Sequence, residues 1–151
     1  MSKWKKQILK ISILIGIVIM ARYTYNLCFV QGESMVPTLE NNQIKFALRT
    51  TLVEPKRWDI VTVKVESNYY LIKRVIGLPG ETIEYKNGKL YINGKETEDK
   101  FSHLTEDYKI TLSENEYCCL GDNRQHSSDS REYGAFPKKE ITSVLVFERE
   151  K

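Results

Sequence analysis

A serine in a constrained turn is the first residue of this sequence that could carry out nucleophilic chemistry. Ser34 lies in the stretch 32–39 (GESMVPTL), after a glycine and three residues before Pro37. Proline has a fixed φ and no N–H, and it biases the preceding residue toward extended backbone. Ser34 is therefore held in stiff backbone. Its local sequence fits a nucleophile and a simple turn serine alike.

A lysine in an apolar run is the candidate partner for such a serine. Lys73 stands in residues 70–77 (YLIKRVIG), a pattern typical of a β-strand. Because alternate residues share a face of a strand, either Lys73 or Arg74 points toward apolar neighbours. Burial disfavours the charged form of a lysine and lowers its pKa, and the neutral amine can act as a general base. The alternative is an edge-strand lysine in solvent.

The polar loop 121–131 (GDNRQHSSDSR) directly follows an apolar strand pattern. Its acids, hydroxyls and arginines indicate an internal network of hydrogen bonds and ion pairs, although a solvated loop has a similar composition. His126 in this loop also permits a Ser34–His126–Asp triad. This is weak evidence for a triad, since the chain has two histidines and one of them can fall in such a loop by chance.

Other kinds of chemistry find little support in the residue types. The three cysteines, Cys28, Cys118 and Cys119, form no CxxC pattern and no zinc spacing with the two histidines. We expect them to be small buried hydrophobes, with Cys118 and Cys119 on opposite faces of a strand. The glycines are scattered and form no phosphate-binding loop. No metal and no cofactor are therefore expected.

Charge and hydropathy divide the chain into an N-terminal segment and a body. Residues 1–32 carry five basic residues and no acid, which leaves the remainder with 18 basic and 20 acidic residues. The body therefore lacks the basic surface that nucleic-acid binding needs, and no nucleic-acid partner is expected. Residues 8–30 are mostly apolar, and four lysines precede the densest part, which places the N-terminus in the cytoplasm if the segment spans a membrane.

We expect an uncleaved membrane anchor rather than a removed signal peptide. The sequence after the apolar run, 20–25 (MARYTY), has no pair of small residues spaced by one, as a cleavage site would require. The expected organisation is a cytoplasmic tail over 1–7, a transmembrane anchor in the lipid bilayer over 8–28, and an extracytoplasmic domain over 29–151. The protein is thus expected in the cell membrane as a single-pass protein.

The body is predicted to be mainly β, an antiparallel sheet or partial barrel, with no amphipathic helix. Short apolar runs separated by turn residues predict strands at 43–48, 60–65, 69–77, 81–86, 89–92, 116–120 and 141–148. Asn-Gly pairs at 87–88 and 93–94 predict two successive hairpins and hence a three-stranded meander. The charged stretch 95–107 is predicted to be a loop.

Taken in order, these segments resemble the type I signal peptidases, which are membrane-anchored Ser-Lys proteases. Residues 34–39 resemble the nucleophile box of that family, and 57–61 (RWDIV) resemble its next box. Residues 73–81 (KRVIGLPGE) are similar to the lysine box, and 121–131 match the last box closely. The resemblance covers nearly the whole chain and suggests the compact form typical of Gram-positive bacteria.

The resemblance implies a role for each matched residue. Ser34 is expected to be the nucleophile and Lys73 the general base, with Ser127 orienting the lysine amine. The residues expected to stabilise the loop are Asp122, Arg124, Asp129 and Arg131. This assignment agrees with the general requirement for a nucleophile, a base, and a third group that aims the base.

The sequence departs from the family pattern at several positions. Trp58 stands where the family usually has glycine, and Glu81 replaces a common aspartate. Gly32 stands where one branch has a serine whose hydroxyl helps to hold the oxyanion. The Ser34 N–H is therefore the expected oxyanion donor, with Gly32 as the possible second site.

The expected substrates are exported pre-proteins that carry a signal peptide. The cleavable segment is expected to pair as an added strand with 31–34 and 71–73, and the substrate-binding residues are predicted to be Gln31, Met35, Leu71 and Ile72. Two other classes remain open from the sequence. One is a self-cleaving Ser-Lys autoprotease, and the other is a catalytically silent, membrane-tethered β module that only binds.

Overall fold

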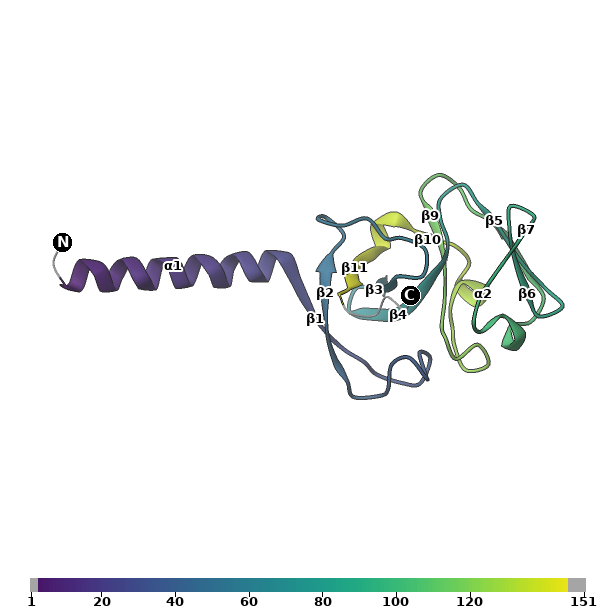
Figure 1. The fold of residues 1–151 in the computed structure, drawn as a ribbon, viewed down its shortest axis with the longest axis horizontal. Helices are drawn as coiled ribbons and strands as arrows, with labels where there is room; N and C mark the ends of the chain where they lie inside the picture. Colours follow the sequence, from purple (N-terminus) through teal and green to yellow (C-terminus); the bar gives the residue numbers. More distant parts are fainter. Residues whose placement is uncertain (1–2, 147–151) are drawn as a thin grey trace.

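A long N-terminal helix extends away from a body of β-strands in the computed structural model, which describes residues 3–146 (Figure 1). Helix α1 (Lys3–Thr24) has 22 residues, about 33 Å at 1.5 Å per residue, which is enough to cross a hydrocarbon core of about 30 Å. None of its residues is buried against the body. By length and composition, α1 can span a membrane.

The helix and the predicted anchor segment 8–28 have different boundaries. The helix begins at Lys3 and ends at Thr24, and strand β1 (Tyr25–Phe29) follows it without a linker. In β1 every second side chain, at Tyr25, Leu27 and Phe29, is exposed and apolar. This period of two marks a strand, and it is hidden in the sequence because it continues an apolar run.

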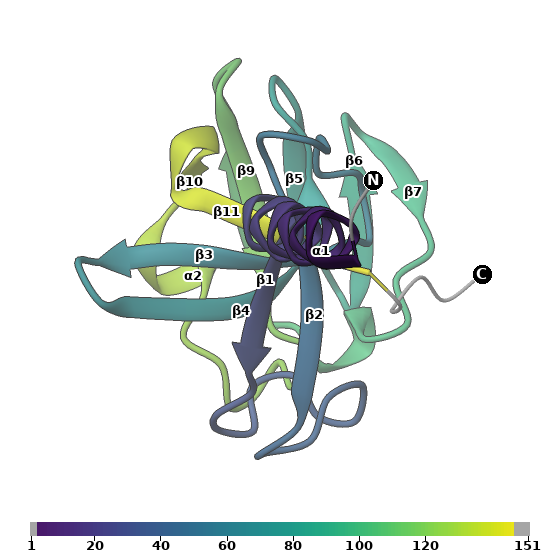
Figure 2. The same ribbon diagram turned by 90° about the vertical axis from the view of Figure 1, so that its left-hand side faces the viewer.

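The body contains a seven-stranded antiparallel sheet, which Figure 2 shows from the side of the helix. Its strands in spatial order are β1, β2 (Ile44–Arg49), β11 (Ile141–Leu145), β3 (Ile60–Glu66), β4 (Tyr69–Gly77), β9 (Glu116–Leu120) and β10 (Phe136–Pro137). The predicted strands over 43–48, 60–65, 69–77 and 116–120 are confirmed, with each boundary within one residue of its prediction. The strand predicted over 141–148 ends at Leu145, and residues 147 and 148 lie outside the described part.

A second, four-stranded sheet contains the predicted meander. Its order is β7 (Lys95–Thr97), β6 (Lys89–Ile92), β5 (Thr82–Lys86) and β8 (Tyr108–Thr111). Both Asn-Gly turns adopt positive φ at both central residues, as two-residue hairpins require. The prediction of a loop over 95–107 was wrong in part, because this stretch contains β7 and the short helix η1 (Ser102–Leu104). The pairing of Lys95–Thr97 with β6 supplies the order that its charged composition lacks.

Three short elements near the C-terminus were not predicted. They are strand β10, helix α2 (Ser130–Tyr133) and helix η2 (Lys138–Glu140). Each is two to four residues long, which is too short to show a periodic pattern. The prediction of a mainly antiparallel β fold with one N-terminal apolar helix is confirmed.

Strand β9 separates two hydrophobic clusters. Cys119 packs in a cluster with Val61, Val75 and Ile141, whereas Cys118 packs on the other side of the strand with Ile83. Both cysteines are fully buried and have free thiols, and Cys28 is half-buried. The expectation of buried cysteines on opposite faces is confirmed for Cys118 and Cys119.

A third cluster lies beneath the stretch 32–39. Met35 and Leu39 are at most 1% exposed and pack with Val30, Ala47 and Ile60. The Val36–Pro37 peptide bond is cis. These buried side chains anchor the stretch from within, so that Ser34 stands at a defined position next to β4.

The turn at Asn93-Gly94 provides a test of the role of the hairpins. Gly94 has φ +79°, and a Cβ added there would meet no atom within 4 Å. We expect Gly94→Ala to lower the free energy of unfolding by about 1 kcal/mol through backbone strain alone. Gly94→Asn should cost less, because asparagine tolerates this conformation. Chemical denaturation would measure both variants, and equal losses would contradict a purely conformational effect.

Candidate active site

Ser34 and Lys73 meet where the stretch 32–39 crosses strand β4. The Lys73 Nζ donates a hydrogen bond of 2.8 Å to the Ser34 Oγ. Lys73 lies opposite Val61 in the pairing of β3 with β4 and is 2% exposed. Of the two sequence interpretations of this lysine, the buried one is confirmed.

Burial changes the acid–base behaviour of the lysine. Removal from water lowers the pKa of Lys73 from 10.5 to about 8, and the negative charge of nearby Asp129 offsets part of this effect. At pH 7 about a tenth of such amines are neutral, against fewer than one in a thousand for a lysine in water. The amine can therefore accept a proton from the hydroxyl that it contacts.

Asp129 is the centre of the loop 121–131. Its carboxylate is fully buried and accepts hydrogen bonds from the Gly121 N–H at 2.9 Å, the Ser127 Oγ at 2.7 Å and the Arg131 Nε at 2.9 Å. Burial alone would raise the pKa of Asp129, but the hydrogen bonds and charge of these neighbours outweigh it, and the pKa is lowered. The loop is thus a built network with a charged carboxylate beside Lys73.

This loop packs directly against the backbone of the serine. The Asn123 N–H donates 3.0 Å to the Ser34 carbonyl oxygen, and Asn123 Nδ2 donates 3.1 Å to the Glu33 carbonyl oxygen. A Cβ added to Gly121 would lie 2.5 Å from the Ser34 carbonyl oxygen and closer still to the Ser127 hydroxyl. Glycine is required at 121 because three segments converge there.

Arg74 and Asp122 form a buried ion pair that the sequence did not reveal. The Arg74 Nε and Nη2 donate to the two carboxylate oxygens of Asp122 at 2.8 and 2.6 Å, and the residues are 5% and 1% exposed. Thr38 Oγ1 also donates to Asp122. Arg74 follows Lys73 on β4, so this pair ties the lysine strand to both the polar loop and the serine stretch. A buried arginine needs an acid, which is the signal that could have linked Arg74 to Asp122.

Arg124 faces the second sheet instead of the lysine. It donates to the Gly121 carbonyl oxygen at 2.8 Å and to Asp99 at 2.8 Å, and its guanidinium lies over the rings of Tyr85 and Phe101. This contact anchors the polar loop to strand β5. The predicted loop-stabilising residues therefore attach the loop at two places. Asp122 binds Arg74 on β4, and Arg124 binds Asp99 beside the second sheet.

Trp58 takes the backbone conformation that glycine favours. Its φ is +72°, its N–H donates 2.8 Å to the Val75 carbonyl oxygen, and its own carbonyl oxygen accepts from Arg74 at 2.8 Å. The turn thus keeps a left-handed residue although a side chain is present. Nearby, Arg57 makes a two-pronged ion pair with Glu81.

The predicted oxyanion groups differ in their surroundings. The Gly32 N–H donates 3.0 Å to Asn41 Oδ1 and is therefore already engaged. Within residues 3–146, the Ser34 N–H donates to no protein group. Of the two, the Ser34 N–H is therefore the group that is free to donate to a bound substrate.

The predicted substrate-binding residues occupy different environments. Gln31 is exposed, Met35 is part of the core, Leu71 is 8% exposed and Ile72 is half-buried. On one side of β4, pairing with β9 begins only at Arg74. In the described chain, residues 69–73 of β4 therefore have no strand beside them on this side, whereas their opposite side pairs with β3.

The histidine alternative is not formed. His126 is exposed, and the hydrogen bond to the Ser34 Oγ comes from Lys73. Over residues 3–146, no group of three or more histidine, cysteine or acidic side chains is placed to hold a metal ion.

Comparison with known proteins places the chain in a family. The family model described as signal peptidase, peptidase S26, matches residues 1–148. Signal peptidase I S of Bacillus subtilis (strain 168) is 38% identical over 164 residues, which cover 96% of this chain and 88% of that protein. Signal peptidase I V of the same organism is 39% identical over 137 residues, covering 77% and 80% of the two chains.

A solved structure supports the fold. The crystal structure of a signal peptidase I from Enterococcus faecalis V583 is 33% identical in sequence and matches with a TM-score of 0.56. The match covers 62% of this chain and 97% of that one.

The buried pair of Arg74 and Asp122 predicts a large effect on stability. Asp122→Ala leaves the guanidinium buried without its partner, and we expect the free energy of unfolding to fall by about 3–5 kcal/mol. Thermal unfolding of the detergent-solubilised protein would measure the loss. Lys89→Ala is the control, because Lys89 and Glu96 form an exposed pair whose loss should cause no measurable change. Similar melting temperatures for the two variants would contradict the structural role of Asp122.

Proposed function

The chain belongs to the signal peptidase family, peptidase S26, and on this premise we propose that it removes N-terminal signal peptides from exported pre-proteins, with Ser34 as nucleophile and Lys73 as general base. The observation that carries the assignment of these two residues is the hydrogen bond between the buried Lys73 amine and the Ser34 hydroxyl. A buried amine of lowered pKa is the type of base that can activate a serine without a histidine.

The proposed reaction runs through an acyl-enzyme. The neutral amine of Lys73 takes the proton of the Ser34 hydroxyl as Oγ attacks the scissile carbonyl carbon. The oxyanion accepts a hydrogen bond from the Ser34 N–H. The protonated lysine then gives its proton to the leaving amine, and Lys73 next activates the water that hydrolyses the ester. No cofactor takes part in these steps.

Ser127 is proposed to orient the lysine amine. Its hydroxyl donates to Asp129, and a hydroxyl oxygen that donates its proton still has acceptor capacity for an amine. Asp129, Arg131 and Gly121 hold this serine in place. We propose that the network keeps the amine aimed at Ser34 while its charge changes.

The substrate is proposed to bind as an extended strand. The edge of β4 over residues 69–73 has free backbone groups, and the stretch 31–34 lies beside Lys73. A peptide added along this edge would bring its scissile bond to Ser34. In this arrangement Gln31 and Leu71–Lys73 contribute backbone pairing. The side chains of Met35 and Ile72 pack beneath the bound peptide.

Helix α1 is proposed to be an uncleaved membrane anchor. Lysines 3, 5, 6 and 10 precede its densest apolar part, which places the N-terminus in the cytoplasm and the catalytic body outside. The active site is then at the outer membrane surface, where the signal peptides of exported proteins emerge.

A cleavage assay on a model pre-protein with alanine before the scissile bond tests the two catalytic residues. We expect Ser34→Ala to abolish cleavage and Lys73→Met to lower kcat by about 10²–10⁴-fold, because the serine loses its base. The matched controls are Ser67→Ala and Lys64→Met, since both residues are exposed. A serine-reactive acyl probe should label Ser34 in the wild-type protein only. Activity of Lys73→Met at the wild-type level would refute the assignment.

The lowered pKa of Lys73 predicts a pH profile. The active form is the neutral amine, so kcat/KM should rise about tenfold per pH unit below pH 8 and level off above it. The rise should follow a single ionisation. A flat profile between pH 6 and about pH 9 would mean that Lys73 is not the base.

A further inference from the structure

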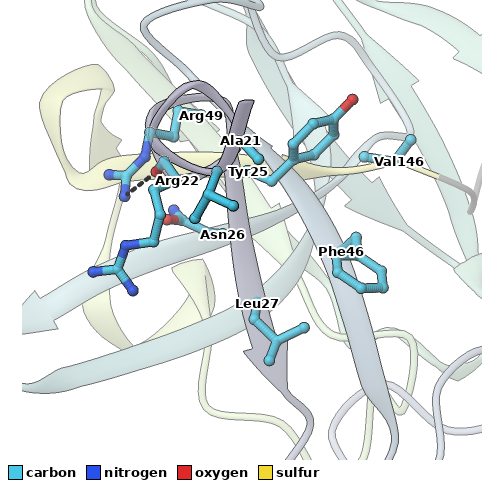
Figure 3. A pocket seen from close by; sticks show the side chains of 9 residues that line it. Ala21, Arg22, Tyr25, Asn26, Leu27, Phe46, Arg49 and Val146 are labelled. Atoms are coloured by element: carbon cyan, nitrogen blue, oxygen red, sulfur yellow. Dashed lines mark hydrogen bonds between the residues drawn. The ribbon is translucent and has the colours of Figure 1, made fainter. Parts of the chain in front are cut away.

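A cavity of about 810 Å³ lies where helix α1 joins strands β1 and β2, away from the candidate active site (Figure 3). Its lining includes residues from all three elements. Three apolar side chains, Val18, Leu27 and Phe46, form one part of the wall. Arg22, Asn26 and Arg49 form a polar part.

The two arginines lie next to each other at the end of the helix. In Figure 3 both guanidinium groups extend to the same side of the junction, opposite the rings of Tyr25 and Phe46. Arg49 Nη2 donates 3.4 Å to the Arg22 carbonyl oxygen, which uses one of its five N–H donors. In the described part of the chain neither arginine takes part in an ion pair, and no acidic residue lines the cavity. Among residues 3–146, the pair therefore presents positive charge without a counter-ion in the cavity wall.

With α1 spanning a membrane as proposed, the arginines lie at the depth of the lipid phosphates. Arg22 lies in the last turn of α1, directly after the apolar run 11–21. A basic residue at the end of a spanning helix reaches the headgroup region. Because β1 follows α1 without a linker, Arg49 on the neighbouring strand β2 is held at the same end.

The apolar wall matches an acyl chain. Leu27 and Phe46 face each other across β1 and β2 and are 51% and 58% exposed, and Val18 on the helix is 55% exposed. A free phosphate ion would make no use of this wall. A molecule with a phosphate and a hydrocarbon chain would satisfy both parts of the cavity.

We propose that this cavity binds an anionic phospholipid of the outer leaflet. Its phosphate lies between Arg22 and Arg49, and one acyl chain follows Val18, Leu27 and Phe46. The inference rests on the proposed membrane anchoring of α1. The bound lipid would fix the angle between helix and body, and thereby the height of Ser34 above the membrane.

Native mass spectrometry of the full-length protein in detergent tests the site. The probes are phosphatidylglycerol and phosphatidylcholine with the same acyl chains. We expect the wild-type protein to retain phosphatidylglycerol preferentially, and Arg22→Gln/Arg49→Gln to lower its retention about 25-fold, from a factor of about five per basic residue. Arg22→Lys/Arg49→Lys keeps the charge and should retain most of the lipid.

Lys86→Gln/Lys139→Gln is the matched charge control, because it removes two exposed lysines of the body. An equal loss in this control, or equal retention of both lipids by the wild-type protein, would overturn the proposal. Displacement of the lipid by an equal concentration of glycerol phosphate, which lacks acyl chains, would also overturn it, because the site would then bind phosphate alone.

Pre-protein cleavage measured on the same samples separates this proposal from the proposed function. A wild-type protein that retains phosphatidylglycerol but does not cleave refutes the peptidase and leaves the lipid site. A protein that cleaves but shows no preference between the lipids refutes the lipid site alone.

Discussion

The burial of one amine is the constraint on which the rest of this structure depends. Lys73 is 2% exposed and its pKa is lowered to about 8 because the charged form is removed from water. A buried lysine destabilises the fold in its charged form, so its surroundings must be rigid enough to keep water out. The strands beside it and the packed stretch 32–39 meet this requirement, and they bring the Ser34 hydroxyl to 2.8 Å from the amine.

Two ion pairs within residues 3–146, one buried and one with a partly exposed arginine, lie near the amine without a hydrogen bond to it. Arg74 with Asp122 joins β4 to the polar loop and, through Thr38, to the serine stretch. Asp129 with Arg131 shapes the loop itself. Each charge is compensated within its own pair, so neither leaves an unpaired charge next to Lys73. The charge of Asp129 still raises the pKa of Lys73 in part, against the larger effect of burial.

Helix α1 and one face of strands β1 and β2 expose large apolar side chains instead of burying them. Helix α1 buries none of its residues, and the exposed apolar face of β1 and β2 continues directly from it. Apolar surface of this extent is typical of contact with a membrane or a partner. The cavity with Arg22 and Arg49 lies at this junction, so helix α1 and the β body are joined by a structured surface rather than by a flexible linker.

The sequence alone determined the elements with strong local signals. Neighbouring residues alone produce three of these signals: the period of two in 69–77, the Asn-Gly turns and the apolar run of helix α1. The motifs around Ser34 and Lys73 identified the family. Strand β1 was hidden because its alternating residues continue an apolar run, and β8 and β10 are short. Only the tertiary structure decided that Arg74 pairs with Asp122, that Arg124 faces the second sheet, and that Arg22 meets Arg49. These contacts join residues 25 to 48 positions apart, which no local pattern in the sequence records. Burial of charge selects the acidic partners of Arg74 and Arg124, whereas Arg22 and Arg49 meet at an exposed junction because β1 pairs with β2.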